Sequence, residues 1–168
     1  MKYRSTRREF LQQTALSGAA LAAGGYFTSR AAAESKSPNE KLNVGMIGVN
    51  NQARFSLGNL RGENIVALCD INDQYLADVA KDFPAAARFN DFRKLLELPG
   101  LDAVAVCTPD HIHAPATAMA LRAGKHVYCE KPLTHNVYEA RLMAKLAGET
   151  KLATQMGTQI HATNNYRR

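Results

Sequence analysis

A turn that could bind a nucleotide begins at Gly48, directly after the apolar run Leu42–Ile47. The segment reads Gly48-Val49-Asn50-Asn51-Gln52-Ala53. Glycines in such a strand–turn–helix connection allow a tight turn and let a pyrophosphate approach the helix N-terminus. Gly48 and Ala53 match the first and third positions of this pattern, whereas Asn50 replaces the second glycine. Asn tolerates a left-handed backbone better than most residues, so we expect the turn itself to survive with Asn50 at this position. The Asn50 side chain would, however, lie where the phosphates need room. By itself, the segment is also compatible with an ordinary strand–helix connection.

An acidic residue 22 positions after Gly48 strengthens the nucleotide interpretation. Asp70 ends a second apolar run, Asn64–Asp70, where dinucleotide-binding domains place a carboxylate that accepts hydrogen bonds from the adenosine ribose. The same charge would repel the additional phosphate of NADP, so the Gly48 turn and Asp70 together favour NAD over NADP. The alternative role of Asp70 is to cap the next helix, together with Asn72.

Apolar runs alternate with helical patterns over residues 41–158. The further strands that we expect are Ala103–Cys107, His126–Cys129 and Leu152–Met156, with a short connection near Arg88–Phe89. The expected helices are Gln52–Arg61, Asp73–Asp82 with Asn72 as N-cap, Phe92–Leu96, Pro115–Ala123, and one that Asn136 and Glu139 open as a capping box and that runs to Thr150. This alternation predicts an α/β fold with a doubly wound parallel sheet in three layers, of the Rossmann type.

Three segments together resemble the Gfo/Idh/MocA oxidoreductase family. They are Gly48-Val49-Asn50 with Asp70, Cys107-Thr108-Pro109-Asp110-His111-Ile112-His113, and Gly124-Lys125-His126-Val127-Tyr128-Cys129-Glu130-Lys131-Pro132. The Glu-Lys-Pro triplet is a hallmark of that family, and the resemblance extends from Lys41 to Met156. It implies a nucleotide-binding domain followed by a second domain that supplies the substrate contacts, the general acid/base and the oligomer interface. We therefore expect residues 159–168 to be the truncated start of the following region, and the full-length parent to be a homo-oligomer.

The resemblance also implies roles for individual residues. Thr108 and Pro109 would line the cofactor cleft, and His113 would lie near the ribose or the nicotinamide. Glu130 and Lys131 would lie beside the nicotinamide, where the Lys131 ammonium could stabilise an alkoxide as hydride leaves. A solvated loop lysine is the alternative for Lys131, and Pro132 is expected to follow a cis peptide bond. The complete predicted cofactor set is Gly48, Asn50, Asn51, Ala53, Asp70, Thr108, Pro109, His113, Glu130 and Lys131, with Lys131 also catalytic.

This resemblance implies an oxidoreductase that transfers hydride between nicotinamide and a sugar, cyclitol or related polyol. The cofactor carries that chemistry, and the protein positions it. Two alternatives stay open: an NAD-dependent glycosidase of the same family, in contrast to hydrolases with paired carboxylates, and a nucleotide-binding fragment without catalysis.

The histidines and cysteines predict no metal site. His111 and His113 lack a third ligand, whereas His126 and His135 are expected to pack in the core or lie on the surface. The three cysteines form no Cys-x-x-Cys motif and are expected to be small buried hydrophobic residues: Cys69, Cys107 and Cys129.

Residues 1–33 are typical of an export signal. The paired arginines Arg7-Arg8, followed by Phe10-Leu11, resemble a twin-arginine (Tat) signal. A modestly apolar stretch follows, and Ala31-Ala32-Ala33 suits a cleavage site. The stretch is shorter than the roughly 20 residues that span a bilayer, so stable membrane insertion is not expected; an N-terminal amphipathic helix or anchor is the alternative. We expect a protein that is exported folded, with its cofactor, to the periplasm or another extracytoplasmic space, and a linker over residues 34–40.

Most of the charge excess lies in this leader. The chain of 168 residues carries a net charge of +6. Residues 1–33 contain five basic residues against Glu9, which leaves 16 basic and 14 acidic residues and only +2 for the remainder. A nucleic-acid partner is therefore not expected. The family resemblance implies a small-molecule substrate instead. With 46% hydrophobic residues, the chain can form one buried core.

Overall fold

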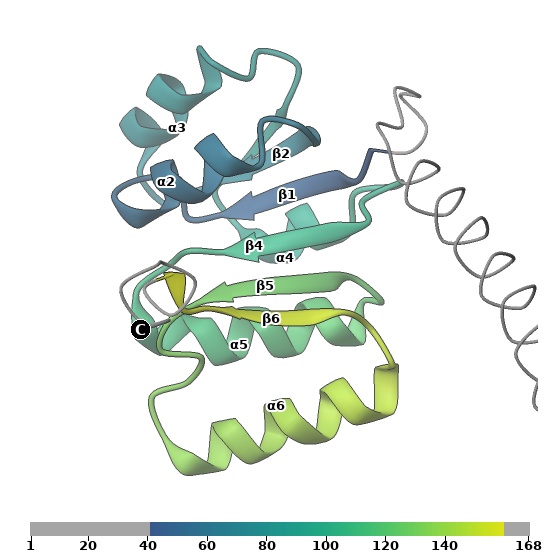
Figure 1. Cartoon of the computed structure of the whole chain (residues 1–168). Helices are drawn as coiled ribbons and strands as arrows, with labels where there is room; N and C mark the ends of the chain where they lie inside the picture. Colours follow the sequence, from purple (N-terminus) through teal and green to yellow (C-terminus); the bar gives the residue numbers. More distant parts are fainter. Residues whose placement is uncertain (1–40, 160–168) are drawn as a thin grey trace, which may run out of the picture. The chain divides into compact units, whose positions relative to one another are not determined.

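The computed structural model describes residues 41–159, in which six strands form one parallel sheet. The strands are β1 (Asn43–Ile47), β2 (Asn64–Cys69), β3 (Ala87–Phe89), β4 (Ala103–Val106), β5 (His126–Glu130) and β6 (Thr154–Gly157). They lie in the order β3-β2-β1-β4-β5-β6 (Figure 1). The expected doubly wound fold is confirmed. The predicted leader, the linker and residues 160–168, with His161, lie outside the described residues.

The winding of the chain reverses between β1 and β4, which are neighbours in the sheet. Ile47 at the end of β1 pairs with Val106 at the end of β4. The amide of Cys107 then donates a hydrogen bond of 2.7 Å to the carbonyl of Ile47. In open α/β sheets, ligands bind outside the carboxyl ends of the strands at such a reversal. The segments that follow β1 and β4 therefore border the crevice in which a ligand is expected.

Five helices complete the three layers. They are α2 (Gln52–Asn59), α3 (Asp73–Ala80), α4 (Phe92–Leu96), α5 (Asp110–Arg122) and α6 (Val137–Thr150). One core forms where α2 and α3 pack on the sheet, around Met46 and Leu68. The other forms under α4, α5 and α6, around Leu95 and Leu121. Figure 1 shows α2 and α3 beside β1 and β2, with α5 and α6 beside β5 and β6. Strands buried on both faces explain the apolar runs without polar alternation.

The helix caps follow the sequence closely. The side chain of Asn72 accepts hydrogen bonds from the amides of Gln74 and Tyr75, so the predicted N-cap of α3 is confirmed. The side chain of Asn136 likewise accepts from the amide of Glu139 at the start of α6. The capping box is only half formed, because the Glu139 carboxylate accepts from the amide of His135 and not from that of Asn136.

The prediction that a helix begins at Pro115 was wrong. Helix α5 begins at Asp110, directly after Pro109, and Pro115 lies inside it. A proline inside a helix removes one backbone hydrogen bond. Burial of the preceding turn offsets this loss, because His113 and Ala114 are almost fully buried against the sheet. The other predicted boundaries differ from the structure by at most two residues, and the connection near Arg88–Phe89 is the short edge strand β3.

Candidate functional site

The turn after β1 requires glycine at its first position. Gly48 has a φ of +85°, and a Cβ atom on it would lie 2.6 Å from the carbonyl oxygen of Cys107. Its amide donates to the carbonyl of Cys69 at the end of β2, at 2.8 Å. Both the backbone conformation and the close approach of the β4–α5 connection therefore exclude a side chain here.

Besides Gly48, the residue of this turn with a positive φ is Asn51 and not Asn50, the position at which the sequence suggested a left-handed backbone. Asn51 has φ 51° and ψ −118° and precedes α2 without a side-chain cap. The Asn50 side chain instead accepts a hydrogen bond of 3.0 Å from Nε of Arg54, one helical turn later. Ala53, the third residue of the pattern, is fully buried in the core under α2.

Substitution of Asn51 by glycine is expected to stabilise the domain by about 1 kcal/mol, because glycine adopts this conformation without strain. Urea denaturation of the variant and the wild type measures the difference. Asn50→Gly is the matched control, because Asn50 has no positive φ. Its replacement adds flexibility and removes the exposed hydrogen bond from Arg54, so it should not stabilise the domain. A stability gain that is equal for the two variants would contradict the assignment of strain to Asn51.

The carboxylate of Asp70 lies against the Gly48 turn. Its Oδ2 accepts from the amide of Val49 at 3.1 Å, and its Oδ1 accepts from the amide of Asn72 at 3.0 Å. The cap of α3 is provided by Asn72 itself. Asp70 thus connects the end of β2 to the turn after β1. A carboxylate has about four lone-pair sites, so two backbone bonds leave room for further donors.

Two further predicted residues follow β4. The hydroxyl of Thr108 is buried without a hydrogen-bond partner among residues 41–159. Pro109 is exposed and precedes α5 with a φ of −59°. An orphaned buried hydroxyl beside the crevice is a feature that a bound ligand or a water molecule would satisfy.

Glu130 ends β5 as a buried carboxylate with several donors. It is 3% exposed, and its Oε1 accepts from Ser56 Oγ of α2 at 2.8 Å and from the Tyr128 hydroxyl at 3.0 Å. Gln159 Nε2 donates to both carboxylate oxygens, at 2.9 and 2.8 Å. Burial and this hydrogen bond to Glu130 raise the pKa of Tyr128 to about 12, so the phenol remains a donor. Gly157 leaves room for the group, because a Cβ there would lie 2.8 Å from Glu130 Oε2.

Lys131 is exposed directly after Glu130, and the Lys131–Pro132 peptide bond is cis, as predicted. Strands β1, β4 and β5 are neighbours and parallel. Gly48, Thr108 and Lys131 therefore follow adjacent strands at the same edge of the sheet. The structure brings these three sequence-predicted residues to one edge, although no hydrogen bond or ion pair within residues 41–159 joins the Lys131 ammonium to the other two.

Comparison with known proteins agrees with this arrangement. The model of the GFO_IDH_MocA family, described as "Oxidoreductase family, NAD-binding Rossmann fold", matches residues 42–158. The chain belongs to the Gfo/Idh/MocA family. It is similar to 1,5-anhydro-D-fructose reductase of Ensifer adhaerens, with 33% identity over 123 residues that cover 71% of this chain and 36% of that protein. Myo-inositol 2-dehydrogenase of Thermotoga maritima is 28% identical over 120 residues, which cover 67% of this chain and 34% of that protein.

Solved structures of other proteins share the fold. Scyllo-inositol dehydrogenase from Lactobacillus casei, with bound NAD(H) and scyllo-inositol, superposes with a TM-score of 0.71 at 22% identity, over 76% of this chain and 39% of that chain. A 3-ketoreductase from Actinomadura kijaniata, in complex with TDP-benzene and NADP, gives 0.70 at 28% identity, over 76% of this chain and 42% of that chain. The present chain thus spans about 34 to 42% of the length of these relatives.

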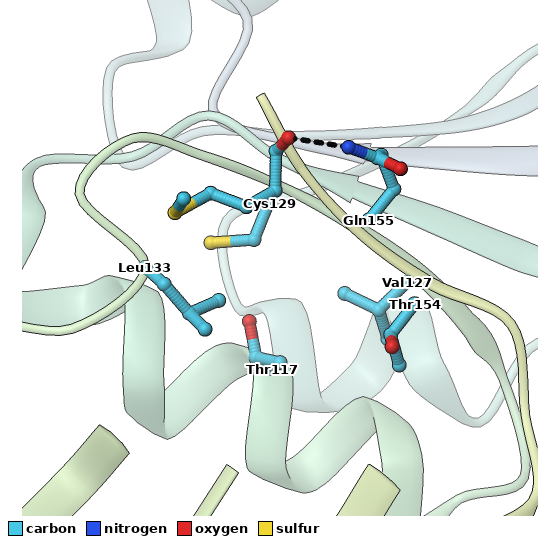
Figure 2. Close-up of a pocket in the computed structure, with 7 residues that line it drawn as sticks. Thr117, Val127, Cys129, Leu133, Thr154 and Gln155 are labelled. Carbon is cyan, nitrogen blue, oxygen red and sulfur yellow. Dashed lines mark hydrogen bonds between the residues drawn. The ribbon is translucent and has the colours of Figure 1, made fainter. Parts of the chain in front are cut away.

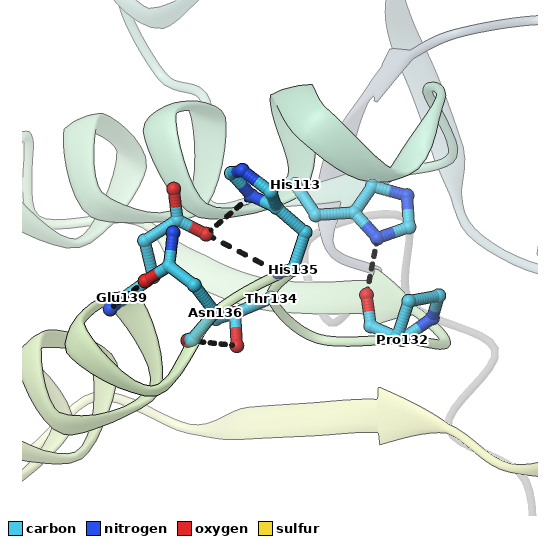
Figure 3. Close-up of polar contacts among 6 residues, drawn as sticks. All are labelled: His113, Pro132, Thr134, His135, Asn136 and Glu139. Carbon is cyan, nitrogen blue, oxygen red and sulfur yellow. Dashed lines mark hydrogen bonds and ion pairs between the residues drawn. The ribbon is translucent and has the colours of Figure 1, made fainter.

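His113 of this Gfo/Idh/MocA domain lies behind the two loops and not in the open crevice. The side chain is 1% exposed. Its Nε2 lies 2.8 Å from the carbonyl oxygen of Thr108. Its Nδ1 lies 2.5 Å from the carbonyl oxygen of Pro132, the contact drawn in Figure 3. Both ring nitrogens are therefore engaged by backbone, and neither is free for a ribose or nicotinamide group.

A pocket of about 80 Å³ opens on the α5 face of the Gfo/Idh/MocA domain, and none of its lining residues belongs to the predicted site. Figure 2 shows the Thr117 side chain pointing from α5 toward Cys129 and Leu133. The Thr117 hydroxyl is buried without a partner in the described part of the chain. The complete lining is Thr117, Val127, Cys129, Leu133, Thr154, Gln155 and Met156.

The cysteines of the Gfo/Idh/MocA domain behave as packing residues. Cys69 and Cys129 are buried and Cys107 is half-buried, and none forms a disulfide. Burial raises the pKa of the Cys69 and Cys107 thiols to about 12, so neither is a nucleophile near neutral pH. Among residues 41–159, no three His, Cys, Asp or Glu side chains group together as metal ligands. Within the same range, no helix has the length and apolar character needed to cross a membrane.

The sequence prediction missed several residues that the structure places at the site. Ser56, Tyr128 and Gln159 surround the Glu130 carboxylate but carry no local signal, because only long-range packing brings them together. Ile71 is 91% exposed directly after Asp70. The position of Ile71 directly after Asp70 is a local signal from which an apolar surface beside the carboxylate could have been predicted.

Proposed function

We propose that residues 41–158 bind NAD along the carboxyl edge of the sheet, in an oxidoreductase that transfers hydride between nicotinamide and a sugar, cyclitol or related polyol. The observation that carries this proposal is the Asp70 carboxylate held against the Gly48 turn by the amide of Val49. Bound NAD would supply the hydride acceptor or donor, and the residues of this chain would position it.

The local geometry fits a dinucleotide. The absence of a side chain at Gly48 leaves the turn close to the β4–α5 connection, and the N-terminus of α2 favours the charge of a pyrophosphate. Free lone pairs of Asp70 would accept hydrogen bonds from the adenosine ribose. The exposed Ile71 side chain offers an apolar surface for the adenine ring. The unpaired Thr108 hydroxyl is a further polar group that a ligand would satisfy.

The preference for NAD over NADP is argued from charge. A second phosphate on the adenosine ribose would lie near the Asp70 carboxylate, and like charges at short distance repel. Arg54 is the cation nearest to the turn in sequence, and its Nε donates to Asn50. We therefore expect NAD to bind more tightly than NADP, although a relative of this chain is described with NADP.

Replacement of Asp70 by asparagine is expected to weaken NAD binding by about tenfold or more, since a hydrogen bond to a charged group is worth about 1.5–3 kcal/mol. The preference for NAD over NADP should narrow at the same time. Isothermal calorimetry with both cofactors measures the two affinities. The asparagine oxygen can still accept from the Val49 amide, so the turn should persist.

Asp73→Asn is the matched control for this experiment, because Asp73 lies three residues after Asp70 and its carboxylate accepts a hydrogen bond from the Asn90 side chain. Its NAD affinity should equal that of the wild type. A wild-type protein that binds neither dinucleotide would overturn the proposed function, and an Asp70→Asn variant with unchanged affinity would remove Asp70 from the site.

The proposed substrate class comes from the relatives. Their names include inositol and anhydrofructose, which are polyols and sugars with oxidisable carbinol groups. Lys131 is proposed to hold a substrate hydroxyl and to stabilise the alkoxide as hydride leaves. Most substrate contacts are proposed to come from a second domain that follows residue 158.

Export by the Tat pathway to an extracytoplasmic space is also proposed. The arginine pair Arg7-Arg8 with Phe10-Leu11 supports it. Because that route carries folded proteins, it would allow the cofactor to be bound before export. Cell fractionation tests the proposal, and retention of the protein in the cytoplasm would overturn it.

A further inference from the structure

The imidazole of His113 lies between the two loops that border the crevice. Thr108 belongs to the connection after β4, and Pro132 belongs to the connection after β5, next to Lys131. The ring nitrogens lie 2.8 and 2.5 Å from the carbonyl oxygens of these two residues. His113 is therefore the link between one wall of the crevice and the segment that carries Lys131.

Both partners of the ring are acceptors, which determines how many protons it carries. A carbonyl oxygen has lone pairs and no proton. A neutral imidazole has one N–H donor and one bare nitrogen, so it could satisfy only one of the two carbonyls and would point a lone pair at the other. Only the imidazolium form, with a proton on each nitrogen, donates to both.

We propose that His113 is an imidazolium ion at neutral pH, and that its two N–H groups hold the Thr108 connection and the Lys131–Pro132 connection together. We call this pair of hydrogen bonds the staple. Its role is positioning: it touches neither cofactor nor substrate and acts through the backbone of the residues that do. The staple itself follows from the contacts of the ring. Its consequence for NAD binding rests on the function proposed above.

The charge balance around the ring agrees with a proton on each nitrogen. Burial lowers the pKa of His113, but the neighbouring Cys129 side chain of β5 and the hydrogen bonds to the two carbonyls outweigh it and raise the pKa to about 9. The nearby ionisable residues of the following loop are paired with each other, since His135 Nδ1 lies 2.8 Å from the Glu139 carboxylate (Figure 3). On α5 itself, Asp110 and His111 are exposed to solvent.

The direction of the pH effect follows from this raised pKa. The ordinary pKa of histidine in an unfolded chain is about 6.5, and that of His113 in the folded chain is about 9. The stabilisation of the folded domain by protonated His113 is fully present below pH ~6.5 and is lost as the pH rises through about 9. The wild-type protein should therefore lose more stability between these values than a variant without the ring.

The decisive experiment is nuclear magnetic resonance of the full 168-residue chain with ¹⁵N-labelled histidine. At pH 7.5, both ring nitrogens of His113 should carry protons, and the signals are assigned by their absence in His113→Gln. A His113 ring with one bare nitrogen at pH 7.5 would overturn the staple, whatever the variants do.

Urea denaturation across the same pH range gives a second readout. The urea concentration at the midpoint of unfolding should fall more steeply between pH ~6.5 and ~9.5 for the wild type than for His113→Gln. His126→Gln is the matched control, because Nδ1 of His126 accepts one backbone N–H, from Ala153, and needs no second proton for that bond. Parallel pH profiles for the wild type and His113→Gln would contradict the proposal.

Calorimetry with NAD then separates the staple from the proposed function. We expect His113→Gln to weaken NAD binding by about tenfold, the effect of one lost charge-assisted hydrogen bond, and His126→Gln to leave it unchanged. If the wild type does not bind NAD, the proposed function fails while the protonation result stands. If the wild type binds NAD and His113 is neutral, only the staple fails.

Discussion

Substitution of Gly48 by alanine is expected to lower the free energy of unfolding by about 3 kcal/mol and to abolish detectable NAD binding. A non-glycine residue with a positive φ costs about 1–3 kcal/mol, and an overpacked contact costs about 1–3 kcal/mol more. Both apply here, because φ is +85° and the new Cβ would lie 2.6 Å from the carbonyl oxygen of Cys107. That neighbour is backbone at the end of β4, so it cannot move without disturbing the sheet.

Urea denaturation followed by circular dichroism measures the loss of stability, and calorimetry measures the loss of binding. Gly58→Ala is the matched control, because Gly58 lies in α2 and has no atom within 4 Å of its would-be Cβ. Alanine in a helix is favoured over glycine by about 1 kcal/mol, so this control should be stabilised and should bind NAD normally. Equal stabilities of the two variants would contradict the tight approach between β1 and β4.

Substitution of Lys131 by alanine is expected to reduce turnover about 10²–10³-fold, the cost of removing one group that stabilises a developing oxyanion. The affinity for NAD should change little, because the adenosine and pyrophosphate contacts lie at the Gly48 turn and Asp70. The measurement is steady-state production of NADH by the protein that carries its proposed substrate domain, with myo-inositol as the first of a panel of polyols.

Lys145→Ala is the control for the loss of a positive charge. Lys145 lies on α6, where its ammonium is 3.8 Å from the Glu149 carboxylate and largely exposed. Its turnover should match that of the wild type. A Lys131→Ala protein with unchanged turnover would assign this residue to the solvated surface and remove it from the catalytic chemistry.

The parts of the site that could be predicted are those with a local pattern. Gly48 follows a buried strand and precedes a helix, and Asp70 ends the next strand, so their spacing already implies a shared edge. The N-cap at Asn72 was predictable for the same reason, since its side chain bonds to amides two and three residues later.

The parts that could not be predicted depend on contacts between distant segments. The Glu130 carboxylate meets Ser56 of α2, 74 positions earlier, and Gln159, 29 positions later. No spacing rule connects such residues. The helix start at Asp110 and the left-handed conformation of Asn51 were misassigned because burial of α5 and packing of the turn outweigh the local preferences of Pro115 and Asn50.

The sequence by itself determined the parallel α/β fold, the glycine turn, the acidic residue that faces it and the family to which the chain belongs. The fold, the turn and the acidic residue follow from periodicity and short motifs, in which neighbouring residues determine the structure. The family follows from the resemblance of the Glu130-Lys131-Pro132 segment and its companions to known members. Only the tertiary structure decided which nitrogen or oxygen meets which partner. It surrounded the Glu130 carboxylate with three donors and placed His113 between two carbonyls. Most buried polar groups are stabilised by a hydrogen-bond partner, and here several of the partners come from distant parts of the chain.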